Sequence, residues 1–166
     1  MTEAVVNAVL ERLGAAGISA LRQYPDKKSP LGNGCIYVSP EVCSCVSVGM
    51  GEYLGTKTAP DGRIIELFGR RLEFELGAEI YVPFSVSNAA EVCLHLGNAM
   101  AQALPSSMPA LRFSEIRLGA VEPKQELEAF CSACRLKGTA LFSAEADEGR
   151  AEFLNFTLKG TVDVGK

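Results

Sequence analysis

The stretch Gly69–Phe84 alternates apolar and polar side chains over an unusual length, and it limits the possible fold more than any other segment. Its even positions from Leu72 to Val82 are all apolar, whereas the odd positions carry arginine, glutamate and tyrosine, apart from Gly77. Because successive side chains of a strand point to opposite faces, the pattern predicts one face on a core and one charged face turned outward. An ordinary strand has about five or six residues, so a strand of this length can extend past the body of its own domain.

Two other segments have the apolar spacing of amphipathic helices. The first begins at the capping residue Thr2 and ends at one of the glycines that follow Leu13. The second opens with Ser87 or Asn88 as a cap, has Glu91 as the partner of a capping box, and stops at Pro105. Each helix would place one apolar stripe on the core.

Alternating patterns predict further strands on both sides of the second helix. The strand before the central one is interrupted at Pro40, because proline cannot donate to a ladder and is confined to edges and bulges. In the central strand a bulge is expected near Gly69, since Ile65 and Leu67 alternate in a different register from the residues that follow. The expected strands cover residues Cys35–Met50, Arg63–Val82, Ala110–Val121, Glu126–Glu145 and Ala151–Val164.

The segment Gly49–Gly62 separates the first two long strands. It is rich in glycine and closes with the turn dipeptide Asp61-Gly62, which predicts a long hairpin loop. The whole order is therefore helix, two long strands, helix, then three strands. This order predicts an α+β fold: a mostly antiparallel or mixed sheet of about five strands, two amphipathic helices on one face, and a long protruding hairpin. Residues 1–166 are expected to form a single domain.

The charge balance narrows the classes of partner. The chain has 16 basic and 20 acidic residues and a net charge of −4, so it lacks the basic surface that nucleic-acid binding requires. No apolar run approaches the ~20 residues of a membrane span, and the amino terminus has no signal-peptide pattern. We therefore expect no sequence-specific nucleic acid and no membrane as partners, and a cytoplasmic site of synthesis.

The six cysteines raise the question of a metal or redox site. Cys131 and Cys134 form a C-x-x-C pair that, joined with Cys43 and Cys45, could supply four thiolates to zinc. The pair lies within an alternating strand pattern, however, where positions i and i+3 point to opposite faces. Free thiols are therefore expected, and a small zinc or thiol redox protein remains the alternative of a different class.

No catalytic pattern is present in the chain. His95 is the only histidine and lies within the second helix, where a surface or structural role is expected. The glycine-rich loop lacks the Gly-Lys-Ser/Thr of a phosphate-binding loop, and Glu73 and Glu75 alternate with Arg71 on one mixed-charge face. The chain is accordingly expected not to be an enzyme, with no catalytic, cofactor-binding or metal-binding residues and no cofactor.

The order of elements resembles that of the phage tail terminator and tail-completion family, as found in contractile phages and phage tail-like particles. The resemblance covers nearly the whole chain and lies in "EAVVNAVLERLGAAGI", the step "QYP", the long hairpin with a glycine-rich tip, and "GRRLEFELGAEIYVP" running into "NAAEVCLHLGNAMAQAL". It implies a ring, commonly a hexamer, that caps the tail tube and joins it to the head or collar. It also implies tube and sheath proteins as partners, and a location in the host cytoplasm during assembly and then in the virion or particle.

A closed ring needs contacts between different surfaces of identical subunits. We expect the charged strand face and the hairpin tip to make them. The expected interface residues are Arg70, Arg71, Glu73, Glu75, Glu79 and Tyr81 from the strand, and Met50, Glu52, Tyr53, Leu54 and Lys57 from the loop. Another ring-forming tail component, such as a connector, tube-like or baseplate protein, would use the same features.

Overall fold

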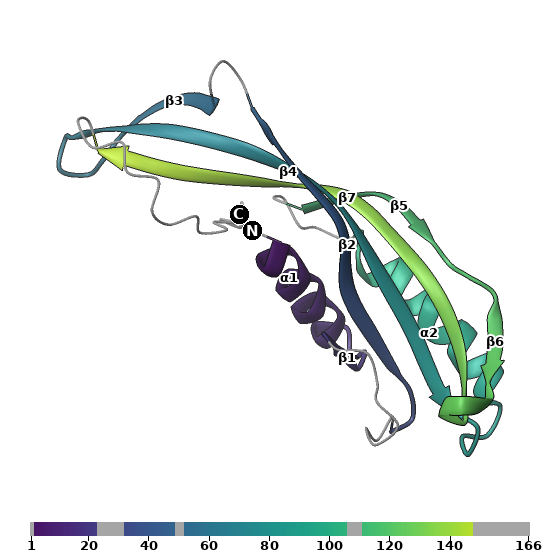
Figure 1. The fold of residues 1–166 in the computed structure, drawn as a ribbon. Coiled ribbons are helices and arrows are strands. Elements are labelled where there is room, and N and C mark those ends of the chain that lie inside the picture. Colours follow the sequence, from purple (N-terminus) through teal and green to yellow (C-terminus); the bar gives the residue numbers. More distant parts are fainter. Residues whose placement is uncertain (1, 23–31, 49–51, 106–110, 148–166) are drawn as a thin grey trace.

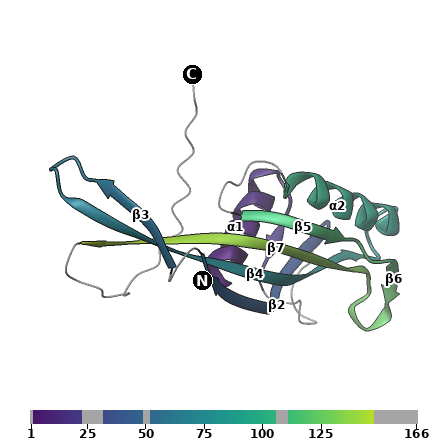
Figure 2. The ribbon, with the colours of Figure 1, turned by 90° about the horizontal axis from the view of Figure 1, so that it is seen from above.

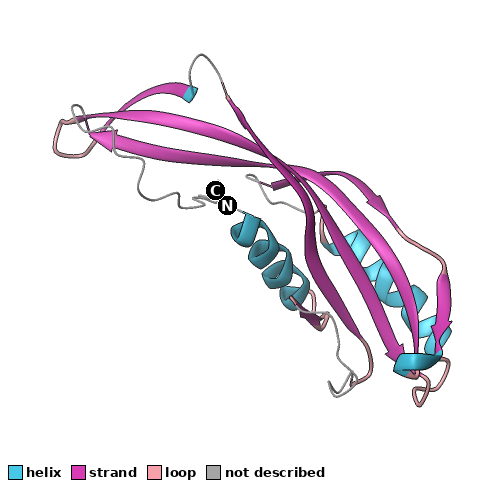
Figure 3. Ribbon diagram, viewed as in Figure 1, coloured by secondary structure: helices cyan, strands magenta, loops and turns pink. Residues whose placement is uncertain are grey.

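The protein is one long, twisted sheet with two helices on one of its faces (Figures 1 and 3). The computed structural model describes residues 2–22, 32–48, 52–105 and 111–147. The helices are α1 (Thr2–Ala15) and α2 (Ala89–Ala103), and a 3₁₀ turn, η2, spans Gln125–Leu127. The strands are β1 (Ala20–Leu21), β2 (Cys35–Ser47), β3 (Tyr53–Thr58), β4 (Ile64–Pro83), β5 (Leu111–Arg117), β6 (Val121–Lys124) and β7 (Ala129–Asp147).

The strand order is β1-β2-β4-β7-β5, with β3 added to β4 and β6 added to β7. The β1–β2 pair is parallel and every other pair is antiparallel. The predicted α+β class, the mostly antiparallel sheet and the two helices are confirmed. The described residues form seven strands: four of the five expected strands lie among them, β1 and β3 are added, and the strand expected over Ala110–Val121 divides into β5 and β6. The strand expected over Ala151–Val164 lies outside the described residues.

The two central strands, β4 and β7, pair without interruption over almost their whole length. Their register runs from Ile65 opposite Asp147 to Pro83 opposite Ala129. The bulge predicted near Gly69 is therefore wrong, and the irregularities lie in the neighbouring strands, at Pro40/Val42 in β2 and at Tyr53/Gly55 in β3. The interruption expected at Pro40 is thus confirmed as a bulge in an otherwise continuous strand.

The hairpin between β2 and β4 is more ordered than the sequence indicated. Residues Tyr53–Thr58, expected to belong to a long loop, pair with β4 as β3. The turn at Asp61-Gly62 is confirmed: Gly62 has a φ of 84°, and the Arg63 backbone N–H donates to the Asp61 carboxylate at 3.1 Å. Pairing with a long strand overrides the weak strand propensity of a glycine-containing segment.

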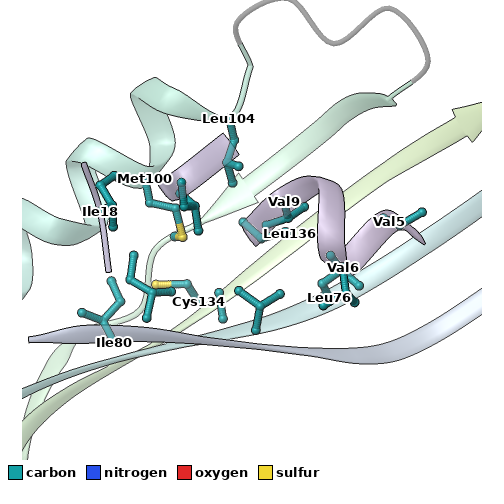
Figure 4. Packing of buried hydrophobic residues seen from close by; sticks show 14 of the residues in the cluster. Val5, Val6, Val9, Ile18, Leu76, Ile80, Met100, Leu104, Cys134 and Leu136 are labelled. Atoms are coloured by element: carbon teal, nitrogen blue, oxygen red, sulfur yellow. The ribbon is translucent and has the colours of Figure 1, made fainter. Parts of the chain in front are cut away.

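The main core lies between the helices and the even positions of β4 (Figure 4). Val6 and Val9 of α1 and Met100 of α2 are fully buried together with Leu76 and Leu136 of the sheet. A smaller buried cluster lies on the opposite face of the sheet, and Leu127 of η2 packs against it. It consists of Cys35, Tyr37, Tyr81, Ala129 and Cys131.

Both helices stop near the glycine and the proline that the sequence indicated. Helix α1 starts at Thr2, and its chain reverses at Gly17, which has a φ of 75°. Helix α2 ends at Ala103, just before Pro105. The predicted capping box is absent, because Asn88 takes a left-handed backbone conformation and its side chain makes no capping hydrogen bond. Glu91 lies instead 3.8 Å from His95, one turn further along.

Candidate subunit interface

A three-stranded projection extends beyond both helices, and we call it the arm. It consists of β3, the β4 residues Ile64–Gly69 and the β7 residues Ser143–Asp147. Figure 2 shows the arm continuing past the ends of α1 and α2, so that neither helix covers it. Strands β4 and β7, which carry the core of the body, therefore continue into the arm without a covering layer.

The arm exposes large apolar side chains. Tyr53, Leu54 and Ile64 are 44%, 47% and 48% exposed, and Leu67 and Phe68 are half-buried. The rings of Tyr53 and Phe68 pack edge to face, with their centroids 5.8 Å apart. A sheet of so few strands is marginal without a packed face, and contiguous exposed apolar patches mark interaction sites. The arm is therefore the strongest candidate interface in the described part of the chain.

Two contacts hold β3 against β4 at the base of the arm. The Leu54 side chain lies over Gly69, where an added Cβ would be 2.5 Å from Leu54 Cδ1. The Arg70 guanidinium donates to the Glu52 carboxylate at 2.6 Å, and this hydrogen bond raises the pKa of Arg70. Glu52 has a φ of 72°, a strained conformation for a residue other than glycine. Arg70 is at an even position, so it faces the helix side and not the charged face of Arg71.

The charged face predicted for β4 exists, but its charges are paired within the chain. Arg71 and Glu73 lie 3.0 Å apart on the exposed surface. Glu75 accepts from Arg135 at 2.7 Å and lies 3.3 Å from Lys137, both on the adjacent strand β7. Exposed pairs of this kind contribute little to stability, and ion pairs already made inside one subunit are poor donors for contacts between subunits. The charged face is therefore a weaker interface candidate than the arm.

Tyr81 must be removed from the predicted interface. It lies at the expected odd position, but only 3% of it is exposed, because Tyr37 packs edge to face against it at 5.7 Å. Its hydroxyl donates to Glu79, and Lys124 Nζ lies 5.4 Å from its ring centre. Burial raises the pKa of Tyr81 well above its usual range. Glu79 and Lys124, 4.0 Å apart, complete a structural group on this face.

The expected loop residues fall into three sets. Tyr53, Leu54 and Lys57 are exposed on β3, Glu52 is engaged with Arg70, and Met50 lies outside the described residues. Sequence reasoning missed Ile64, the most exposed apolar side chain of the arm. Its signal was weak, because Glu66 and Arg70 interrupt the even-numbered apolar series of β4 between Ile64 and Leu72.

The C-x-x-C pair behaves as its strand context predicts. Cys134 is buried in the main core and Cys131 in the small cluster on the opposite face, so their thiols diverge. Cys43 and Cys45 are exposed on β2. Burial raises the pKa of Cys131. Within the described ranges, no three or more potential metal ligands gather in one place.

Comparisons with known proteins add no family assignment. No family model matches the chain, and no curated protein matches it significantly. Among the described residues, no helix is long and apolar enough to cross a membrane.

Proposed function

We propose that this chain is a structural protein of phage tail assembly, a ring-forming terminator that caps the tail tube and joins it to the head or collar. The arm is the observation that carries the proposal. It projects from the body as a twisted ribbon and bears Tyr53, Leu54 and Ile64 at its surface. A projection that reaches past its own subunit and carries exposed apolar groups is suited to a head-to-tail contact, which closes into a ring when the rotation permits.

The charge of the chain supports the same proposal. With a net charge of −4 per chain, a ring of identical subunits would carry a net negative charge. Fixed negative charge disfavours adhesion of phosphates, which suits a channel through which DNA slides. Tube and sheath proteins and a head or collar connector would be the partners, first in the host cytoplasm and then in the assembled particle.

Native mass spectrometry of the purified chain tests ring formation. We expect a closed oligomer in the wild type and monomers in Ile64→Asp, because the charge would be buried at the contact. The matched control is Asn98→Asp, an exposed position on α2 in the body, which should leave the oligomer intact. A wild-type chain that stays monomeric both alone and with tube ends would overturn the proposal.

Electron microscopy of particles assembled without this chain tests the terminator role itself. Loss of a terminator leaves tails of uncontrolled length. Tails of normal length would therefore reject the terminator and favour another ring-forming tail component, which the same arm could also assemble.

A further inference from the structure

Strand β2 has an open edge next to the arm. Strand β1 pairs only with Ile36 and Tyr37, whereas β4 pairs with β2 on the other side as far as Ser47. In the described ranges, no strand pairs with the outer side of β2 from Val42 to Ser47. None of the residues in this segment is charged or a proline, which are the usual protections of an exposed edge. The edge is therefore free to accept another strand.

The free backbone groups of this edge belong to alternate residues. The Val48 N–H donates to the Gly69 carbonyl of β4 at 3.4 Å. Because backbone groups of successive residues in a strand point to opposite sides, those of Val46 and Ser44 also face β4. The N–H and C=O groups of Cys43 and Cys45 then face the open side. An added strand would make its hydrogen bonds with these two cysteines.

The side chains at this edge leave both faces of the sheet incomplete. Cys43 lies beside Phe74 and Cys45 beside Leu72 on the helix-bearing face. Phe74 and Leu72 are 4% and 3% exposed, whereas both cysteines are exposed. On the other face, Val42 is 62% exposed. Free cysteine is usually buried as a small apolar group, so a further strand here would cover side chains that favour burial.

The sequence of the edge reads the same in both directions. The run Val42-Cys43-Ser44-Cys45-Val46 is symmetric about Ser44. In an antiparallel pair of two copies centred on this serine, valine lies opposite valine on one face and Cys43 lies opposite Cys45 on the other. No like charges meet across the pair. A self-complementary surface is what a two-fold contact between identical subunits requires.

The opposite edge of the sheet is a poorer partner for β2. Strand β5 has an irregular register between Phe113 and Glu115. It also carries the charged residues Arg112, Glu115 and Arg117. Bulges and charges are the usual devices against pairing at an edge. These features favour β2 of a second copy, rather than β5, as the strand that covers the β2 edge.

We propose that Val42–Ser47 of two copies pair as antiparallel strands about a two-fold axis at Ser44. The contact uses a different surface from the arm and does not rest on the proposed ring. The paired segments are short and make a small interface, so single reduced chains should separate on dilution, and Ile64→Asp should still be monomeric in native mass spectrometry. Where an assembly holds many copies together, repeated contacts of this kind would strengthen one another.

Thiol–disulfide exchange traps this weak contact and tests its register. Cys43→Ser and Cys45→Ser, one of them isotopically labelled, are mixed with oxidised glutathione, and each protein disulfide forms as one oxidised glutathione is reduced to two thiols. In the mixed pair the remaining thiols lie directly opposite each other, whereas in two copies of one variant they are diagonal, about 7–8 Å apart and too far to bridge. We expect mixed dimers to exceed either same-variant dimer at least tenfold by intact mass. Dimers in the statistical ratio, or no dimers, would overturn the proposal.

Charge at the centre of the pair gives a second test. Ser44→Lys would place two ammonium groups opposite each other, so we expect at least tenfold less disulfide-linked dimer than in the wild type. Mixing Ser44→Lys with Ser44→Glu should restore the dimer, because opposite charges then meet. The matched control is the mixture of Asn98→Lys and Asn98→Glu, at an exposed position of α2, which should give no more dimer than the wild type. If the Ser44 mixture gives no more dimer than Ser44→Lys alone, two-fold pairing of β2 is wrong, and the proposed ring is unaffected.

Discussion

The two halves of β4 have the same backbone but opposite surroundings. In the body, Leu72, Leu76 and Ile80 lie under the helices and are at most 3% exposed. In the arm, Ile64 lies on the same face of the same strand and is 48% exposed. Alternation thus decides which face a side chain occupies, but a second layer decides whether that face is buried. An exposed apolar side chain such as Ile64, beyond the helices, makes the arm a candidate interaction site.

The largest expected contrast between the two halves is in folding stability. Leu76→Ala should lower the free energy of unfolding by about 2–5 kcal/mol, because it leaves a cavity under both helices. Ile64→Ala should lower it by less than about 1 kcal/mol in the monomer, since that side chain is already half exposed. Urea denaturation of each variant checks this. Equal losses would mean that the arm is an integral part of the monomer core.

The same contrast explains what the sequence could predict. The alternation placed Leu76 on the core face, and strand geometry alone implied that Cys131 and Cys134 diverge, because both depend only on local period. It did not predict the burial of Tyr81, which depends on Tyr37 from the adjacent strand β2, far away in the sequence, and on the cover of η2.

The missed features of the arm have a similar cause. The apolar positions of β4 change from odd (Ile65 and Leu67) to even (Leu72 onward) near Gly69, which suggested a bulge. The register is continuous, however, and the change occurs where the helices end. Strand β3 was missed because its pairing partner is β4, and the pairing stabilises Gly55 and its neighbours in a conformation that their own propensities do not favour.

A second contrast concerns two glycines of the central strands. A Cβ at Gly138, in the body, would lie 2.3 Å from the Arg112 backbone carbonyl oxygen. Gly138→Ala should therefore destabilise by about 1–3 kcal/mol, because backbone must move. At Gly69 the nearest atom is the end of the exposed Leu54 side chain, which can rotate away, so Gly69→Ala should have the smaller effect. Thermal unfolding of both variants compares them, and hydrogen exchange in β3 reports whether Leu54 is displaced. A larger loss from Gly69→Ala would show that the base of the arm is as rigid as the body.

A buried thiol makes the free energy of unfolding depend on pH in the alkaline range. Burial raises the pKa of Cys93, in α2, from an ordinary value of 9.0 to about 11. The folded state therefore favours the neutral thiol. This contribution to stability is complete below pH 9 and is lost as the pH rises toward 11. The unfolding free energy should fall across that window, and the fall should shrink in Cys93→Ala. Cys43→Ala, at an exposed position, is the matched control for removing a thiol.

The smallest expected effect is on the charged face. Arg71 and Glu73 are each about half exposed at a separation of 3.0 Å, where solvent screens their attraction. Replacing either residue with alanine should change the unfolding free energy by less than about 1 kcal/mol. If the arm and not this face joins subunits, Glu73→Ala should also leave ring stability unchanged, whereas Ile64→Asp abolishes it. Native mass spectrometry at low and moderate salt measures this. If Glu73→Ala weakens the ring, and weakens it more at low salt, the charged face is a main subunit contact and the apolar arm contributes less.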